Sequence, residues 1–97
     1  MKTGINLIEE ERKEQLYKHE ISIDADMLNN KDYQLSKAAT VLATYDPSEW
    51  DSPEDCQPEG WDRFLWERAY HKPYKERLII AGALIAAEID RLQYENK

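Results

Sequence analysis

The sequence predicts a small all-α fold: a helical bundle of three main helices, with a long, acidic, proline-rich loop before the last helix. Two observations carry this prediction. Apolar residues recur at helical spacing in three separate stretches of the chain. Between the second and third stretches, residues 46–60 hold three prolines and six acidic residues, which disfavours a regular helix or strand there. A chain of 97 residues has room for one core, so we expect residues 1–97 to form a single domain.

The first expected helix begins near Thr3 or Asn6 and ends near His19 or Glu20. Both starting residues are of types that cap helices, and Asn6 with Glu9 three positions on resembles a capping box. One face of this helix carries an apolar stripe that we expect to pack on the core: Ile5, Ile8 and Leu16.

The second expected helix covers residues 32–45, and the preceding segment 21–30 is expected to be an ordered loop. Its apolar residues repeat at helical spacing and include small side chains that allow close approach of a neighbouring helix: Leu35, Ala38, Ala39 and Leu42. After the acidic loop, residues 61–66 are expected to form a short helical turn. Three of its apolar residues could fold back on the core: Trp61, Phe64 and Leu65.

The last expected helix starts at Pro73, which suits a first helical turn, and continues to about Tyr94. Its predicted core face consists of Leu78, Ala81, Gly82, Ile85, Ile89 and Leu92. The middle of this helix is apolar on nearly all sides. Such a helix is either central in its own bundle or shared across the interface of a homodimer.

Composition and charge exclude several classes of protein. The net charge is −7, from 20 acidic and 13 basic residues, so we expect no nucleic-acid partner and no anionic membrane surface. Cys56 is the only cysteine, which rules out an internal disulfide and a multi-cysteine metal site. The first residues do not resemble a signal peptide, and the longest apolar stretch is too short for a membrane span. We therefore expect a cytoplasmic protein.

Polar residues occupy otherwise apolar faces on two of the expected helices. Arg12, Gln15 and His19 share the core stripe of the first helix, and Glu88 lies among apolar residues of the last. A buried charge is costly without a partner, so Arg12 and Glu88 are expected to pair. Two interpretations stay open: a buried salt bridge that sets helix register, or a polar pocket that holds a small ligand.

The segment from Glu10 to Glu14 reads EExxE and resembles the first acidic motif of the MazG-type all-α nucleotide pyrophosphohydrolases. That resemblance implies Mg²⁺ bound by Glu10, Glu11 and Glu14, with Glu88 as a fourth ligand. The family's second motif is ExxD, whereas the nearest segment here, from Glu88 to Asp90, reads ExD. The alternative for the first helix is an ordinary solvated acidic face.

Aromatic residues gather in and around the acidic loop, and four of them define a predicted partner surface: Trp50, Trp61, Trp66 and Tyr70. The alternative is that these side chains cover the ends of the bundle.

The chain as a whole resembles a family of short helical proteins from bacteriophages and prophages. The resemblance rests on Thr3-Gly4-Ile5, on Arg12 and Gln15 within an ERxxQ pattern, and on the GALIAAEI segment at 82–89. It implies a phage setting and no particular chemistry. Two functions are therefore carried forward. The first is a non-enzymatic accessory protein without a cofactor, which binds a protein partner. The alternative is a Mg²⁺-dependent nucleotide pyrophosphohydrolase.

Overall fold

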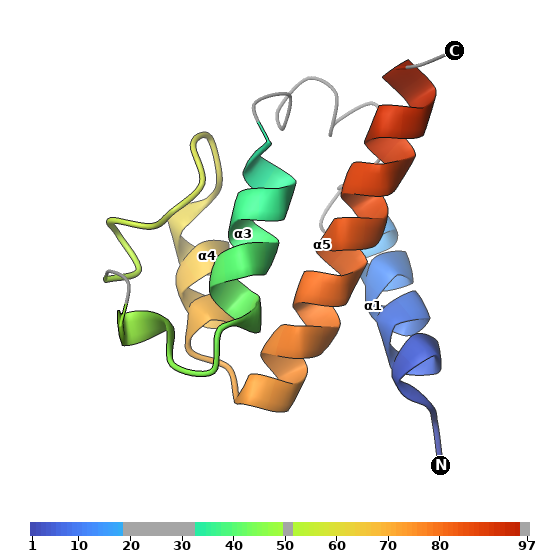
Figure 1. Cartoon of the computed structure of the whole chain (residues 1–97), viewed down its shortest axis with the longest axis horizontal. Coiled ribbons are helices and arrows are strands. Elements are labelled where there is room, and N and C mark those ends of the chain that lie inside the picture. The colour runs from blue at the N-terminus through green and yellow to red at the C-terminus, as the bar shows by residue number, and fades with distance from the viewer. Residues whose placement is uncertain (19–32, 50–51, 96–97) are drawn as a thin grey trace.

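The computed structural model describes residues 1–18, 33–49 and 52–95. These residues form four helices and contain no strand, which confirms the all-α bundle (Figure 1). The elements are α1 (Gly4–Lys18), α3 (Gln34–Ala43), a short 3₁₀ helix (Pro47–Glu49), α4 (Arg63–Tyr70) and α5 (Tyr74–Glu95). The prediction of three main helices was incomplete, because the expected turn at 61–66 is the beginning of α4. The expected loop at 21–30 lies outside the described residues.

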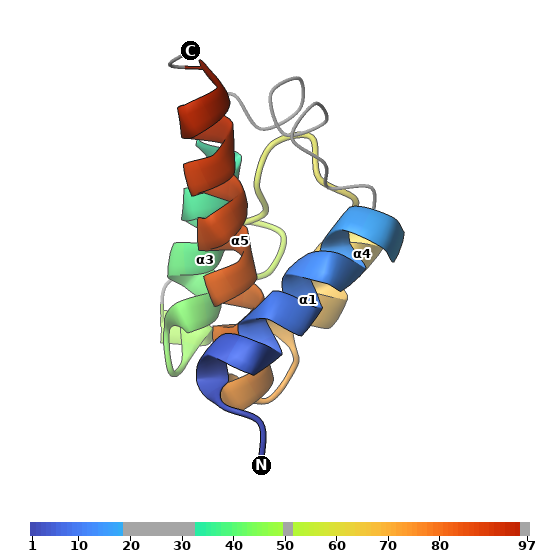
Figure 2. The same ribbon diagram turned by 90° about the vertical axis from the view of Figure 1, so that its right-hand side faces the viewer.

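Helix α5 lies between α3 and α1, and α4 packs behind α3 (Figure 1). Helices α3 and α5 run side by side in opposite directions, whereas α1 crosses α5 obliquely (Figure 2). None of the described helices is long and apolar enough to span a membrane.

Helix α1 starts with a reciprocal cap between Thr3 and Asn6. The Asn6 backbone N–H donates to Thr3 Oγ1 at 3.2 Å, and the Thr3 N–H donates to Asn6 Oδ1 at 3.1 Å. This is a capping box in which Asn6 replaces the usual Glu or Gln, so the predicted pairing of Asn6 with Glu9 was wrong. Ile8 is half-buried against α5, but Ile5 is exposed. The predicted core position of Ile5 was wrong, because it lies one turn before the crossing of the two helices.

Helix α3 supplies the centre of the core. Its expected apolar residues are all buried, which confirms the prediction: Leu35, Ala38, Ala39 and Leu42. The helix is shorter at both ends than the predicted range 32–45.

Helix α4 turns a different face to the core than the sequence predicted. The Asp62 carboxylate caps it by accepting a hydrogen bond from the Leu65 N–H at 2.9 Å. Trp66 and Tyr70, one helical turn apart, point inward and are buried. Phe64 and Leu65 therefore face outward, with 75% and 44% of their surface exposed.

Helix α5 also packs with a different face than predicted. Its buried side consists of small and charged residues together with one leucine: Arg77, Ala81, Ala83, Leu84, Ala87, Glu88 and Arg91. Of the predicted core face, Ala81 is buried and Gly82 is partly buried, whereas the four large aliphatic residues are exposed. The alanines let α3 and α5 approach closely, and this close packing turns the bulky side chains away from α3.

Candidate functional site

The most prominent surface feature is an apolar stripe along α5, formed by Leu78, Ile85, Ile89 and Leu92. We call it the α5 stripe; its side chains are 39%, 49%, 50% and 39% exposed, respectively. At about 100° per residue these positions fall within about 60° on one side of the helix. The half-exposed Tyr74 extends the stripe by one turn. Its ring contacts that of the exposed Tyr45 edge-on, with 5.2 Å between the ring centroids.

None of the charged residues of α5 falls on the angular sector that holds the stripe. The two nearest are Lys75, in the first turn of the helix, and Glu88, which is turned toward the core. Contiguous exposed aliphatic side chains without interspersed charges are typical of interaction sites on folded proteins.

A second feature is a set of buried polar side chains on α1, α3 and α5. We call it the polar cluster, and none of its members is more than 9% exposed: Arg12, Gln15, Gln34, Glu88 and Arg91. The sequence pointed to three of the five. Gln34 and Arg91 were missed, although Arg91 lies one helical turn after Glu88 on the same face. His19, also predicted for this cluster, lies outside the described residues.

The pairing inside the polar cluster differs from the predicted one. Glu88 Oε1 accepts a hydrogen bond from Arg91 Nε at 2.5 Å, and both side chains are buried. Arg12 lies 3.6 Å from the carboxylate of Asp90. The predicted Arg12–Glu88 pair was therefore wrong: the carboxylate is held by an arginine of its own helix. The Arg91 guanidinium also lies over the ring of Tyr33, 5.7 Å from its centroid.

Gln15 connects the polar cluster to the acidic side of α1. Its Nε2 donates to Glu11 Oε2 at 3.2 Å. Its Oε1 is buried and has no hydrogen-bond partner among the residues that the structure describes. This geometry holds Glu11 against its own helix.

Three of the four glutamates of the alternative metal site line a shallow, open groove of about 200 Å³ between α1 and α5. The full lining is Leu7, Glu10, Glu11, Glu14 and Ile79. Glu88 is not part of this groove; it lies in the polar cluster.

The geometry of these carboxylates does not match a metal site. Glu10 is paired with Lys2 at 2.6 Å. Across the described parts of the chain, no three His, Cys, Asp or Glu side chains are placed so that they could hold one metal ion. The structure thus does not bring Glu10, Glu11, Glu14 and Glu88 together.

The predicted aromatic partner surface was wrong for the residues that the structure describes. Trp66 is completely buried and Tyr70 is nearly so, and Trp61 is partly buried against them. The ring centroids lie 5.9 Å apart for Trp61 and Trp66 and 6.3 Å apart for Trp66 and Tyr70. Trp66 Nε1 donates to the Pro53 carbonyl at 2.7 Å and so fastens the acidic loop to α4. These rings belong to the core, and Trp50 lies outside the described residues.

Arg77, at the start of α5, caps the C-terminal end of α3. Its guanidinium donates to four backbone carbonyls: those of Leu42 (3.0 Å), Thr44 (2.5 Å), Tyr45 (2.8 Å) and Lys72 (2.9 Å). The last carbonyls of a helix have no partner within the helix, and they attract a cation. Sequence reasoning missed this role, although Arg77 lies on the same helical face as Ala81 and Leu84.

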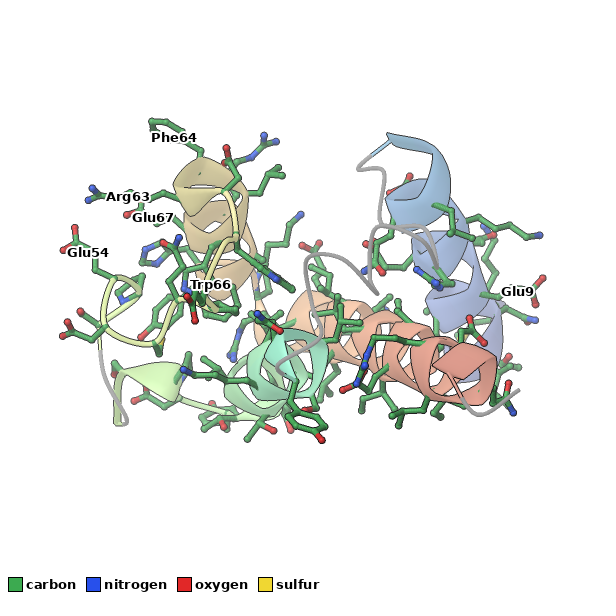
Figure 3. All side chains as sticks on the ribbon, turned by 90° about the horizontal axis from the view of Figure 1, so that it is seen from above. Glu9, Glu54, Arg63, Phe64, Trp66 and Glu67 are labelled. Carbon is green, nitrogen blue, oxygen red and sulfur yellow. The ribbon has the colours of Figure 1, made fainter. Side chains whose placement is uncertain are left out.

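On the outer side of α4, Arg63 lies between Glu54 of the acidic loop and Glu67 (Figure 3). The hydrogen bond to Glu67, followed by the negative charge of Glu54, raises the pKa of Arg63 above its ordinary value. Phe64 points away from the core beside this network (Figure 3). The network is exposed, and through Arg63 it links α4 to the acidic loop.

Comparisons with protein-family models, with curated proteins and with solved structures found no match to this chain.

Proposed function

We propose that this protein is a non-catalytic accessory protein that acts by binding a protein partner through the α5 stripe. The observation that carries the proposal is the exposure of Leu78, Ile85, Ile89 and Leu92 along one uninterrupted side of the longest described helix. The phage setting implied by the sequence resemblance would place this partner among phage or host proteins.

The shape and chemistry of the stripe support a helical partner. The stripe is straight and apolar, and a second helix that packs on it needs apolar residues at spacings of three and four. The exposed aromatic residues Tyr45 and Tyr74 flank one end of the stripe, where rings commonly contribute to protein interfaces.

The test is site-specific photo-crosslinking in cells that produce the protein. A photoreactive phenylalanine derivative replaces Ile85 in one variant. In the matched control it replaces Phe64, which is also apolar and exposed but lies on α4, away from α5 (Figure 3). We expect a defined protein adduct from position 85 and none of the same mass from position 64. Identical adduct patterns at both positions, or no adduct at position 85, would contradict the proposal.

A further inference from the structure

We propose that α1 is a strap that detaches from α5 while α3, α4 and α5 stay folded, and that its release widens the surface on which the α5 stripe binds a partner. The second half of this inference rests on the proposed function, because it assigns a means of regulation to the same surface.

Helix α1 contributes nothing to the described hydrophobic core. Every described residue of that core, and every partly buried apolar residue packed against it, belongs to α3, α4, α5 or the loop between α3 and α4. Helix α1 lies on the side of α5 that faces away from α3 and crosses α5 obliquely (Figures 1 and 2). Its removal therefore leaves the apolar contacts of the core in place.

The contact of α1 with the rest of the protein buries few apolar side chains. The two side chains of α1 that are described as buried, Arg12 and Gln15, are both polar. Its apolar residues Leu7, Ile8 and Leu16 are only partly buried. Burial of polar side chains contributes little net free energy, because they lose their hydration. Segments with few buried apolar contacts open at a lower free energy than the core, so α1 should detach first.

The part of α5 that α1 covers lies directly beside the α5 stripe. Ile8 lies on Gly82, and Ile79 lines the groove between the two helices. At about 100° per residue, Gly82 lies about 20° around the helix from Ile89, which forms the edge of the stripe, and Ile79 lies about 60° further on. Without α1, the apolar sector within residues 78–92 would widen from about 60° to about 140°.

This wider surface comes closer to the size of a stable interface. Such an interface buries about 800 Å² on each partner. The four side chains of the α5 stripe are at most 50% exposed and supply much less. Release of α1 adds Ile79, together with the small residues Gly82 and Ala86, on which a partner helix can pack closely. A partner that uses Gly82 competes with α1, so docked α1 lowers its apparent affinity.

Hydrogen exchange tests the detachment of α1 without any partner. Exchange under native conditions, followed by mass spectrometry, compares the opening of the individual helices. We expect backbone amides in the middle of α1 to exchange at least about 100-fold faster than those in the middle of α3 and α5. Equal protection of α1 and α5 would overturn the inference, because α1 would then open only when the whole protein unfolds.

A disulfide bond between positions 8 and 82 distinguishes detachment from fraying within the helix. A Cβ atom built at position 82 lies 2.9 Å from Ile8 Cγ1, so a sulfur at that place is within bonding reach of a second cysteine. Oxidised Ile8→Cys/Gly82→Cys should protect α1 as strongly as α5. The reduced form of the same variant should keep fast exchange in α1, with a circular dichroism spectrum like that of the wild type. Unchanged exchange after oxidation would overturn detachment.

Photo-crosslinking tests the regulation of partner binding. The oxidised and reduced forms of the disulfide variant, each with the photoreactive residue at position 85, are mixed with an extract of the producing cells. We expect the adduct to be at least about fivefold weaker in the oxidised form. The wild type with the same photoreactive residue, treated with and without reductant, is the control and should give equal adduct under both conditions.

The outcomes separate this inference from the proposed function. An adduct of equal strength from the oxidised and reduced forms would overturn the regulation by α1 and leave partner binding through the stripe intact. No adduct from position 85 in any form would overturn the proposed function and, with it, the regulation. The hydrogen exchange result decides the detachment of α1 in either case.

Discussion

Ile8 of α1 lies directly on Gly82 of α5, where a side chain would have no room. A Cβ atom built at position 82 would lie 2.6 Å from Ile8 Cδ1 and 2.9 Å from Ile8 Cγ1. Carbon atoms in good contact are about 3.5–4.0 Å apart. The missing side chain of Gly82 thus sets how closely α1 approaches α5.

Gly82→Ala should destabilise the protein by about 1–3 kcal/mol, the usual cost of overpacking a well-packed contact. A loss of stability would be informative, because a glycine-to-alanine change within a helix otherwise stabilises a protein by about 0.5–1 kcal/mol. The β-branched Ile8 is stiff and cannot easily swing aside. Urea unfolding followed by circular dichroism measures the difference in free energy.

Gly4→Ala is the matched control, because none of the described residues lies within 4 Å of a Cβ built at position 4. This variant should be as stable as the wild type or slightly more so. Shortening the opposing side chain should relieve the clash, so the Ile8→Ala/Gly82→Ala double variant should lose less stability than the two single losses added together. A Gly82→Ala protein that is more stable than the wild type would disprove the close contact.

The helices could be predicted from the sequence, but the face that α5 turns to the core could not. In α3 the apolar residues form one stripe, so periodicity alone identifies its buried side. Around α5 two faces compete, one with the bulky Leu78 and Ile85, the other with Ala81 and Ala87. Hydrophobicity favours the bulky face, whereas packing against α3 selects the smaller side chains. That choice depends on the shape of the neighbouring helix α3, and the local sequence pattern of α5 carries no information about it.

The polar cluster was predictable in its location and less so in its pairing. Arg12 and Glu88 lie on apolar faces, and this pattern by itself indicates buried charge. Which cation pairs with the Glu88 carboxylate depends on the packing of the helices. In the structure it is Arg91, which lies on the same helix as Glu88. Aromatic content was equally ambiguous, because a tryptophan such as Trp66 is common both in cores and at interfaces.

Removal of Arg77 should be among the most damaging single changes outside the apolar core. Arg77→Met keeps the apolar stem but leaves carbonyls at the end of α3 without donors, and each unsatisfied buried group costs about 1–3 kcal/mol. We expect a total loss of about 3 kcal/mol, since water can reach some of these carbonyls. Thermal and urea unfolding measure this loss.

Arg77→Lys separates charge from geometry. Lysine keeps the positive charge but lacks the planar fork that reaches several carbonyls at once, so it should recover less than half of the stability. Arg68→Met removes an exposed arginine of α4 and should change stability by less than about 0.5 kcal/mol. Full recovery by lysine would show that the helix dipole alone accounts for the effect.

Glu88 should be coupled energetically to Arg91 and not to Arg12. Glu88→Ala leaves the buried Arg91 charge without this carboxylate, which predicts a loss of about 3–5 kcal/mol. Replacing both residues, as in Glu88→Ala/Arg91→Met, should restore much of that loss, because an apolar pair has no buried charge to compensate.

A double-mutant cycle between positions 88 and 91 measures their coupling, and a parallel cycle between positions 12 and 88 is its control. We expect at least about 1.5 kcal/mol in the first cycle and less than about 0.5 kcal/mol in the second. The reverse order would mean that Arg12, the partner predicted from the sequence, is the one that matters.

Trp66 should hold the acidic loop through its hydrogen bond to the Pro53 carbonyl. Trp66→Phe keeps an aromatic ring in the core but removes the N–H donor, so we expect a loss of about 1–2 kcal/mol. The buried Cys56 belongs to the same loop, and its thiol donates to the Ser52 carbonyl at 3.2 Å. Loosening the loop should therefore make this thiol react faster with a chromogenic thiol reagent under native conditions.

The control is Phe64→Ala, which removes an exposed ring from the same helix and should leave both stability and thiol reactivity nearly unchanged. Faster labelling of Cys56 in Trp66→Phe than in Phe64→Ala would show that the indole N–H restrains the loop. Equal labelling rates, with stability still lowered in Trp66→Phe, would mean that Trp66 stabilises the core by packing alone and that other contacts position residues 52–60.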